Sequence, residues 1–381
     1  MKKIKNIKKA AERIKKAVHN NERIILYGDS DLDGISSVVI LEEAIKSLGG
    51  RIDCAFFPDR ENDGYGINLK ALEILKNKAP ALFITLDLGI GNVKEVEDAN
   101  KMGFEVIIID HHESLIGTPK ASIIVNPKQE SDDYSFKGLA NVGVTFNLSL
   151  ELLGAGISDN LKNSFLELAA LATIADMVPQ INQNQEIIEQ GLRSLKSTFR
   201  PALRAFLDIL GNGEVFENSL PKIISALNAA ESVNFKNESY ALLACPDVKK
   251  CKEMAQILLD KNKNKQLQIK NIVQEIERRI SQKPAQPIIF EGDRSWKLAS
   301  AGSASSIICN KYEKPVFIFK HGDKESCGSV RNPKGTNSVD AMKTCCSFLM
   351  TYGGHAQASG FRVKNEHLDK FRDCLNDFFK K

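Results

Sequence analysis

Features that would place the chain in an oxidising compartment or in a membrane are scarce in the sequence. Its eight cysteines include no C-x-x-C pair and no regular spacing, which argues against a zinc ribbon and favours reduced, mostly buried thiols. No apolar run approaches the roughly 20 residues that a membrane-spanning helix needs. The lysine-rich N-terminus is not followed by an apolar segment. We therefore expect a soluble, cytoplasmic protein that is not exported and makes no membrane contact.

An excess of one charge is also missing. Fifty-two Lys and Arg residues stand against 48 Asp and Glu residues, which leaves a net charge of +4. This weak excess permits nucleic-acid binding without requiring it. At 381 residues the chain is too long for one ordinary domain, so we expect two lobes with separate cores.

An acid-rich turn early in the chain is its most informative stretch. The apolar run Ile24-Ile25-Leu26 leads into Gly28-Asp29-Ser30-Asp31-Leu32-Asp33-Gly34, and an apolar segment from Ile35 to Leu41 follows. This order predicts a strand, the acids, and then a helix. Three carboxylates at alternate positions repel one another, so we expect a cation there. Hard oxygen ligands favour Mg²⁺ or Mn²⁺.

Two other interpretations of this turn are weaker. A calcium loop of the EF-hand type also begins Asp-x-Asp-x-Asp-Gly, but the twelfth position counted from Asp29 is Ile40 instead of glutamate. A strand, instead of a helix, is also predicted before the acids. The purely structural alternative is that one aspartate caps the following helix while the others are solvated.

Short apolar segments recur along the first half of the chain. The pattern predicts strands at 52–57, 81–86, 105–109 and 122–125, and helices at 69–78 and 93–102. Alternating strands and helices predict an α/β fold with a doubly wound parallel sheet. A long, exposed helix over 251–281 is predicted to join it to a smaller, mixed α/β domain.

Acids and histidines follow three of these strands. Asp29 follows the first strand, Asp87-Leu88-Gly89 follows the strand ending at 86, and Asp110-His111-His112 follows the strand ending at 109. The carboxyl ends of parallel strands share one edge, where ligands bind. Asp176, just before Met177-Val178-Pro179, adds an acid where a proline ends a predicted helix. We expect these side chains to share a metal centre.

The ordered motifs resemble those of the DHH phosphoesterases that carry a DHHA1 domain. Besides the acid-rich turn, Asp87-Leu88-Gly89 and Asp110-His111-His112, the set includes Thr173-Ile174-Ala175-Asp176-Met177-Val178-Pro179 and Gly353-Gly354-His355. Within this superfamily the chain is most similar to the RecJ-like exonucleases specific for single-stranded DNA. Supporting signatures are Pro58-Asp59-Arg60, Gly64-Tyr65-Gly66, Asn126-Pro127, Leu227-Asn228-Ala229-Ala230 and Gly328-Ser329-Val330-Arg331.

The resemblance implies a domain plan and a catalytic centre. It implies a DHH phosphoesterase domain over 1–205, a helical connector with the long helix over 206–283, and a DHHA1 substrate-binding domain over 284–381. It implies two Mn²⁺ ions, with Mg²⁺ as a substitute. The metal ligands implied are Asp29, Asp31, Asp33, Asp87, His111 and Asp176, with Asp87 as the bridge, Asp31 on the first ion, and Asp33, His111 and Asp176 on the second. Asp87, His111 and His112 are the implied catalytic residues, His112 facing the scissile phosphate.

A second group of residues is expected to bind the substrate. Glycines such as Gly353 and Gly354 let backbone N–H groups approach a phosphate. Arg331, in an expected loop, would pair with a phosphate. The full set is His112, Arg60, Ser329, Arg331, Gly353, Gly354 and His355. Tyr27 stands where some relatives carry a metal-binding histidine, so Asp29 or water would complete that ligand shell.

The resemblance implies a hydrolase: a metal-dependent exonuclease that digests single-stranded DNA from 5′ to 3′ in DNA repair, recombination or replication, with RNA left open as a substrate. A phosphodiesterase of short RNA or cyclic dinucleotides is the alternative enzyme. A replisome-associated scaffold is the alternative of another class, although the chain retains the metal ligands such scaffolds lose. The sequence ends before the OB-fold that bacterial relatives usually carry, so a replication or repair partner replacing it is a further hypothesis.

Overall fold

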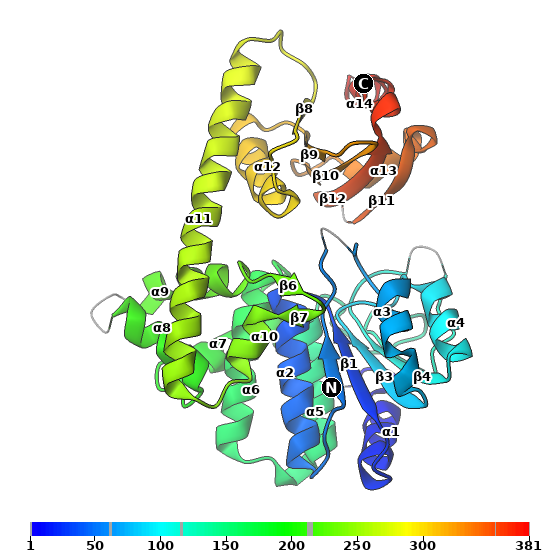
Figure 1. Ribbon diagram of the computed structural model, residues 1–381, viewed down its shortest axis with the longest axis vertical. Helices are drawn as coiled ribbons and strands as arrows, with labels where there is room; N and C mark the ends of the chain where they lie inside the picture. The colour runs from blue at the N-terminus through cyan, green and yellow to red at the C-terminus, as the bar shows by residue number, and fades with distance from the viewer. Residues whose placement is uncertain (1, 61–62, 115–116, 212–215, 355, 381) are drawn as a thin grey trace. The chain divides into compact units, whose positions relative to one another are not determined.

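Two units, Met1–Asn262 and Lys263–Lys381, make up the chain. The computed structural model describes residues 2–60, 63–114, 117–211, 216–354 and 356–380 (Figure 1). Each unit is built on its own sheet. The sequence-based division at 205/206 and 283/284 stays a prediction.

A parallel sheet of five strands organises the first unit. Its order is β2-β1-β3-β4-β5, and every neighbouring pair is parallel. The strands are β1 (Ile24–Gly28), β2 (Cys54–Phe56), β3 (Ala81–Leu86), β4 (Phe104–Ile109) and β5 (Ile123–Val125). The central strands are almost entirely buried, as continuous apolar runs in a sheet covered on both faces should be. The predicted parallel α/β fold is confirmed.

Helices cover both faces of this sheet. Ile25 of β1 belongs to the core shared with α3 (Leu69–Leu75) and α4 (Val93–Lys101). Its neighbour Leu26 belongs to the opposite core, which α1, α2 and α5 complete. These helices are α1 (Ile7–His19), α2 (Leu32–Ser47) and α5 (Asn141–Leu153). Successive strand residues therefore feed two separate cores, because side chains alternate across a sheet.

A mostly helical segment completes the first unit. It contains α6 (Asp159–Ala175), α7 (Asn182–Leu195), α8 (Pro201–Leu210), α9 (Phe216–Leu227) and α10 (Glu238–Leu243). Earlier in the unit, short 3₁₀ turns follow α3 at Lys76–Lys78 and α5 at Gly154–Gly156. A small hairpin of β6 (Ser232–Val233) and β7 (Lys236–Asn237) interrupts the helices. The sequence did not indicate this hairpin, because its turn is Asn234-Phe235 instead of the usual Asn-Gly.

One long helix, α11 (Val248–Ser281), contributes to both units. Cys251 and Leu258 near its start are buried in the core of the first unit. Ile269 and Ile276 near its end are buried in a core of the second unit. The predicted long helix is confirmed, and its apolar positions serve two cores.

The second unit has a mixed sheet of five strands in the order β11-β12-β10-β9-β8. The strands are β8 (Ile289–Asp293), β9 (Val316–His321), β10 (Glu325–Arg331), β11 (Leu349–Gly354) and β12 (Ala358–Lys364). Only the β8–β9 pair is parallel. One face packs against α12 (Leu298–Tyr312), and the other packs against α13 (Ser338–Thr344) and α14 (Leu368–Phe379), with 3₁₀ turns at Cys346–Phe348 and Asn365–His367. The smaller mixed α/β domain is confirmed.

One cysteine expectation is wrong. Cys345, at the end of α13, forms a disulfide with Cys374 of α14, and their Cα atoms are 6.0 Å apart. The two residues are 29 positions apart in sequence, and only the packing of α13 on α14 brings them together. Spacing alone could not indicate this pair.

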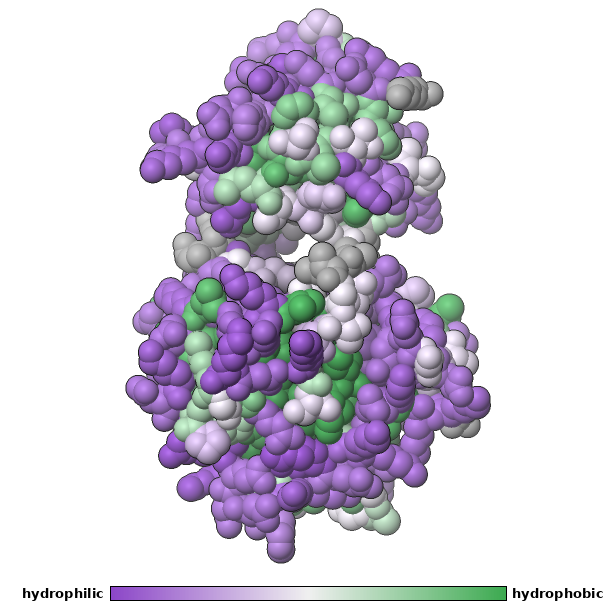
Figure 2. All heavy atoms as spheres, turned by 90° about the vertical axis from the view of Figure 1, so that its right-hand side faces the viewer, coloured by the Kyte–Doolittle hydropathy of each residue, from purple (hydrophilic) through white to green (hydrophobic). Residues whose placement is uncertain are grey.

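The surface seen in Figure 2 is mostly hydrophilic in each unit, with smaller areas of apolar side chains. Met177 and Phe199 are large apolar side chains that are 89% and 85% exposed. Among the described residues, no helix combines the length and the apolar character needed to cross a membrane.

Candidate metal centre

Backbone pairing places three acids at one edge of the first sheet. Asp29, Asp87 and Asp110 each follow the last residue of a strand. The N–H of Asp29 donates to Leu86 O at 3.1 Å, and the N–H of Asp87 donates to Ile109 O at 3.0 Å. The backbones therefore stay in register one residue past the strand ends, which sets these acids side by side.

The start of α2 supplies two more acids. Asp31 caps the helix, because its Oδ1 accepts hydrogen bonds from the N–H groups of Asp33 and Gly34, both at 3.1 Å. Asp33 lies in the first turn and is buried. A Cβ atom on Gly34 would lie 2.5 Å from the carbonyl oxygen of Asp29. Glycine therefore lets the helix begin directly against the turn.

Three groups of side chains lie close enough to hold a metal ion. They are Asp29, Asp31 and Asp87; Asp87, His111 and His112; and Asp33, His111 and Asp176, and the potential ligand atoms within each group lie within 4.8 Å of one another. Asp87 belongs to two groups, and it has a left-handed backbone with φ of 65°. The structure thus brings together all seven acids and histidines predicted for the catalytic centre.

The His111 ring is oriented for metal binding. Its Nδ1 lies 3.1 Å from Leu139 O, and a donated hydrogen bond there leaves the lone pair on Nε2. Nε2 lies 3.3 Å from Asp87 Oδ1 and 3.7 Å from Asp176 Oδ2. Burial lowers the pKa of His111 to about 3, so the ring is neutral.

Two buried polar atoms of this cluster favour a bound cation. His111 Nε2 and Asp176 Oδ2 have no hydrogen-bond partner among the described residues. Such atoms are costly to bury without a partner. A hard divalent cation with mixed carboxylate and imidazole ligands would satisfy both, so these residues fit the Mn²⁺ or Mg²⁺ expected from the sequence.

The electrostatics of the acids also favour a cation. Burial and the neighbouring carboxylates raise the pKa values of Asp33 and Asp87 well above the ordinary value. Burial, together with repulsion from Asp31, raises the pKa of Asp176 to about 7. The side chains are costly to ionise together unless positive charge is added.

Asp110 organises the histidine pair, a role that sequence reasoning missed. This fully buried acid accepts a hydrogen bond from His112 Nδ1 at 2.8 Å and another from the His111 backbone N–H at 2.7 Å. Although burial raises the pKa of Asp110, the hydrogen bond from His112 brings it to about 2. The only signal in the sequence was its place at the head of Asp110-His111-His112.

Arg60, which the sequence predicts to bind substrate, contacts two carboxylates in the structure. Its Nε donates to Asp29 Oδ1 at 2.8 Å, and its Nη2 donates to Asp31 Oδ2 at 2.8 Å and to Asp29 Oδ2. Its guanidinium carbon lies 5.7 Å from the centre of the Tyr65 ring. The Tyr65 hydroxyl in turn donates to Asp87 O at 3.2 Å. Arg60 therefore neutralises two of the expected metal ligands.

Family comparisons agree with this arrangement. Residues 23–173 match the family model described as "DHH family, N-terminal domain", and residues 285–381 match the "DHHA1 domain". The two matches together cover more than half of the chain. The chain belongs to the DHH family and carries a DHHA1 domain. The predicted resemblance is confirmed.

Individual relatives are named exonucleases. Over 380 residues the chain is 32% identical to the single-stranded-DNA-specific exonuclease RecJ of Bacillus subtilis (strain 168), covering 98% of this chain and 48% of that protein. The Escherichia coli (strain K12) protein of the same name is 28% identical, with 98% of this chain and 69% of that protein covered. The chain thus spans about half the length of the B. subtilis relative.

The fold is similar to that of a crystal structure of exonuclease RecJ bound to manganese. The TM-score is 0.83 at 25% sequence identity, and the match covers 99% of this chain and 95% of that chain.

Four of the expected substrate residues, Ser329, Arg331, Gly353 and Gly354, lie on the sheet of the DHHA1 domain. Ser329 and Arg331 were expected in a loop, but they belong to strand β10. This expectation is wrong because pairing with β9 and β12 overrides the weak strand propensity of Gly328 and Ser329. Ser329 pairs with Gly360, which pairs with Gly353 on β11.

Local contacts hold Arg331 on this sheet. Its Nε donates to Ser306 Oγ at 3.0 Å, and its Nη1 donates to Val330 O at 2.8 Å. Gly354 ends β11 with φ of 126°, a conformation that favours glycine. His355 lies outside the described residues.

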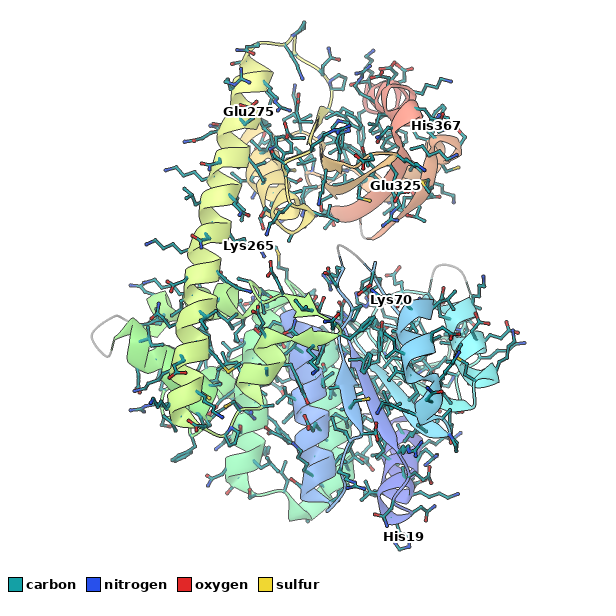
Figure 3. All side chains as sticks on the ribbon, in the orientation of Figure 1. His19, Lys70, Lys265, Glu275, Glu325 and His367 are labelled. Atoms are coloured by element: carbon teal, nitrogen blue, oxygen red, sulfur yellow. A yellow bond between two sulfur atoms is a disulfide. The ribbon has the colours of Figure 1, made fainter. Side chains whose placement is uncertain are left out.

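Tyr27 and two histidines outside the motifs have other surroundings. Tyr27 is fully buried, and its hydroxyl donates to Gly66 O at 3.3 Å and accepts a hydrogen bond from Asn68 Nδ2 at 3.2 Å. His19 ends α1, at the opposite end of the first sheet from the acids, and His367 lies in the DHHA1 domain (Figure 3).

Proposed function

We propose that the chain is a metal-dependent exonuclease that hydrolyses phosphodiester bonds in single-stranded DNA. The observation that carries this proposal is the convergence of five acids and two histidines at the edge of the parallel sheet, with Asp87 and His111 each shared by two groups. The names of the relatives, single-stranded-DNA-specific exonucleases, support the substrate class. Mn²⁺ is the proposed cofactor and Mg²⁺ its substitute, in keeping with the manganese-bound structure of similar fold.

The proposed ligand sets are drawn from the three groups without His112, which is assigned to the substrate. In this proposal Asp87 would serve both ions, Asp29 and Asp31 would serve the first, and Asp33, His111 and Asp176 would serve the second. When bound, two such ions lower the pKa of an attacking water and neutralise the phosphate and the leaving oxygen.

The protein fixes these ligands before any ion binds. Asp33 accepts hydrogen bonds from the backbone N–H groups of Asn141 at 2.9 Å and Val142 at 2.6 Å. Leu139 O fixes the ring of His111. This preorganisation supports a centre that loses little freedom on binding an ion.

His112 and Arg60 act on the substrate in this proposal. Asp110 holds His112 Nδ1, so the other edge of the ring is available to stabilise charge on the scissile phosphate. Arg60 holds the carboxylates that serve the first ion and competes with that ion for them. Once displaced, its guanidinium can pair with a phosphate of the strand.

The DHHA1 domain supplies the remaining proposed substrate contacts. Arg331 and Ser329 offer a guanidinium and a hydroxyl from neighbouring positions of β10. Gly353 and Gly354, with His355, offer backbone N–H groups and an imidazole for the sugar–phosphate chain. Digestion from the 5′ end, RNA as a second substrate, and a replication or repair partner are finer parts of the same proposal.

Digestion of end-labelled strands tests this function. Single-stranded DNA and RNA, labelled at either the 5′ or the 3′ end, are incubated with the protein and Mn²⁺, and Asp87→Asn serves as the inactive control. Immediate release of a labelled mononucleotide from 5′-labelled DNA is expected. Cleavage confined to RNA oligomers of a few residues would move the chain to the short-RNA phosphodiesterases. No cleavage of any strand by freshly metal-loaded protein would contradict the proposal.

A further inference from the structure

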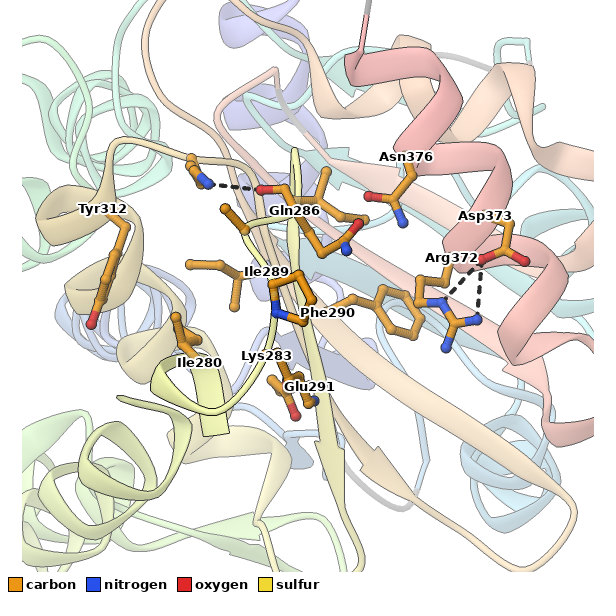
Figure 4. Close-up of a pocket in the computed structure, with 14 residues that line it drawn as sticks. Ile280, Lys283, Gln286, Ile289, Phe290, Glu291, Tyr312, Arg372, Asp373 and Asn376 are labelled. Atoms are coloured by element: carbon orange, nitrogen blue, oxygen red, sulfur yellow. Dashed lines mark hydrogen bonds and ion pairs between the residues drawn. The ribbon is translucent and has the colours of Figure 1, made fainter. Parts of the chain in front are cut away.

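A pocket in the DHHA1 domain is lined by residues other than those assigned to the proposed reaction. It has a volume of about 660 Å³ and lies between the end of α11, strand β8, the end of α12 and helix α14 (Figure 4). Strand β8 is at one edge of the sheet, and β11, with Gly353 and Gly354, is at the other edge. The volume is that of a site for one small molecule.

The walls of the pocket are apolar and partly aromatic. Tyr312, the last residue of α12, lies on one side, and Phe290 of β8 lies on the other, with Ile289 between them (Figure 4). The Phe290 ring is fixed by its contact with Phe319, with ring centres 4.8 Å apart. An apolar ligand can therefore bind against a wall that is already in place at Phe290.

A buried carboxamide is directed into this apolar space. Asn376 of α14 is 9% exposed and lines the pocket. Its Oδ1 is buried and has no hydrogen-bond partner among the described residues. In Figure 4 the group points toward Gln286 across the opening. An acceptor left unsatisfied in this position favours a ligand that donates a hydrogen bond there.

The charged residues that line the pocket have a small positive excess: Lys283, Lys314 and Arg372 stand against Glu291 and Asp373, and Lys283 is paired with Glu291. Lys314 donates to the backbone oxygen of Gln286 at 2.7 Å, and within the described ranges it forms no ion pair with a carboxylate. Arg372 also lines the pocket, although Asp369 and Asp373 partly neutralise it. A ligand with one anionic group would therefore find a cation beside the apolar space.

We propose that this pocket binds a free nucleoside monophosphate. The base occupies the apolar space, the carboxamide of Asn376 meets the polar edge of the base, and the phosphate lies at Lys314. A carboxamide can accept a hydrogen bond from, and donate one to, the adjacent polar groups of adenine. Nucleoside monophosphates are the class of product that the proposed exonuclease releases, but this binding does not depend on that activity.

Calorimetric titration of the full, Mn²⁺-loaded chain tests this site. The probes are dAMP, deoxyadenosine and inorganic phosphate, together with a single strand that has a 5′-terminal phosphorylated deoxyadenosine, which is titrated in EDTA so that it is not digested. The variants are Lys314→Gln, Asn376→Leu and Tyr312→Ala, and Lys343→Gln is the control because Lys343 is an exposed lysine of α13 outside the pocket. Thermal melts verify that each variant is folded.

Binding of dAMP to the wild-type chain is expected, and Lys314→Gln should weaken it about tenfold while leaving the affinity for deoxyadenosine unchanged. Asn376→Leu and Tyr312→Ala should each weaken both ligands, and Lys343→Gln should weaken neither. If Asn376→Leu does not fold, Lys314→Gln and Tyr312→Ala still decide the outcome.

Three results would overturn the proposal. The first is no binding of dAMP to the wild-type chain. The second is dAMP binding that is lost in Asp87→Asn but unaffected by the pocket variants, which would place the nucleotide in the metal centre. The third is equal binding of the phosphorylated strand with the same sensitivity to Lys314→Gln, which would assign the pocket to strand ends. All three measure binding, so they stay distinct from a failure of the proposed nuclease activity.

Discussion

At the scale of single residues, the candidate metal centre depends on side chains that the sequence could name but could not place. The acids and histidines were recognisable because they follow strands or lie at the ends of helices, and strand ends in a parallel sheet meet at one edge. The contact of Arg60 with Asp29 and Asp31 was not recognisable. Nothing in one dimension says which rotamer an arginine about 30 positions away adopts.

Arg60→Ala should separate the stability of the metal-free chain from its affinity for metal. Removing the guanidinium leaves Asp29 and Asp31 to repel each other, so the free energy of unfolding in EDTA should fall by about 1 kcal/mol, a modest value because Arg60 is partly exposed. Mn²⁺ should bind more tightly, since its competitor is gone. Denaturant unfolding in EDTA and calorimetric Mn²⁺ titration measure the two effects.

Lys70→Ala is the matched control for this substitution, because Lys70 pairs with Asp63 outside the metal groups and its side chain is 70% exposed. It should change neither quantity. Equal destabilisation of Arg60→Ala with and without Mn²⁺ would show that Arg60 has only a structural role.

Asp110→Asn should lower activity without removing metal. The amide no longer provides a charged acceptor for His112 Nδ1, so the ring loses its orientation. Removing such an orienting partner typically costs about 10–100-fold, and we expect a loss of that size in cleavage of single-stranded DNA. Metal content, measured by elemental analysis, should match wild type. Loss of bound Mn²⁺ in this variant would mean that Asp110 supports the ligands and not His112.

At the scale of elements, buried apolar runs made most of the first sheet predictable. Strands β1, β3 and β4 could be identified because both faces are covered and their sequences are continuously apolar. Strand β10 could not be identified. Its Gly328 faces Phe361 and Phe319 so closely that a Cβ would lie 2.4 Å from the Phe361 ring, and a glycine selected by tertiary packing looks like a loop residue in sequence.

Gly34→Ala tests the close approach of the first turn of α2 to the backbone of Asp29. The added methyl group would meet the backbone of Asp29, which cannot rotate away, and we expect a loss of about 1–3 kcal/mol in the free energy of unfolding. Urea denaturation measures it. Gly91→Ala is the matched control, because a Cβ there meets no atom within 4 Å, and it should change stability by less than about 0.5 kcal/mol. Similar values for the two variants would contradict the proposed crowding.

At the scale of the whole molecule, each unit has its own core, so a ligand that binds one unit can stabilise that unit alone. The metal groups lie in the first unit, and the DHHA1 sheet has its own cores. The sequence predicted two lobes from the length of the chain and a long helix from the spacing of its apolar residues. The helix's division of its apolar residues between two cores follows from tertiary packing and was not predictable.

Mn²⁺ should therefore protect one unit and not the other. A ligand that binds only the folded state stabilises by about 2.7 kcal/mol at a concentration 100 times its Kd. Hydrogen exchange followed by mass spectrometry should show slower exchange in the acid-rich turn and after β3 when Mn²⁺ replaces EDTA. Exchange in α14 should stay the same. Equal protection of α14 would argue against a metal effect confined to the first unit.

The central claim is that the first unit holds two metal ions that share Asp87. Anomalous X-ray scattering from crystals grown with Mn²⁺ tests it most directly. Two manganese peaks are expected per chain, both within bonding distance of the Asp87 carboxylate, one also near Asp31 and the other near His111. A single peak, or peaks that do not touch Asp87, would contradict the two-metal centre and the mechanism built on it.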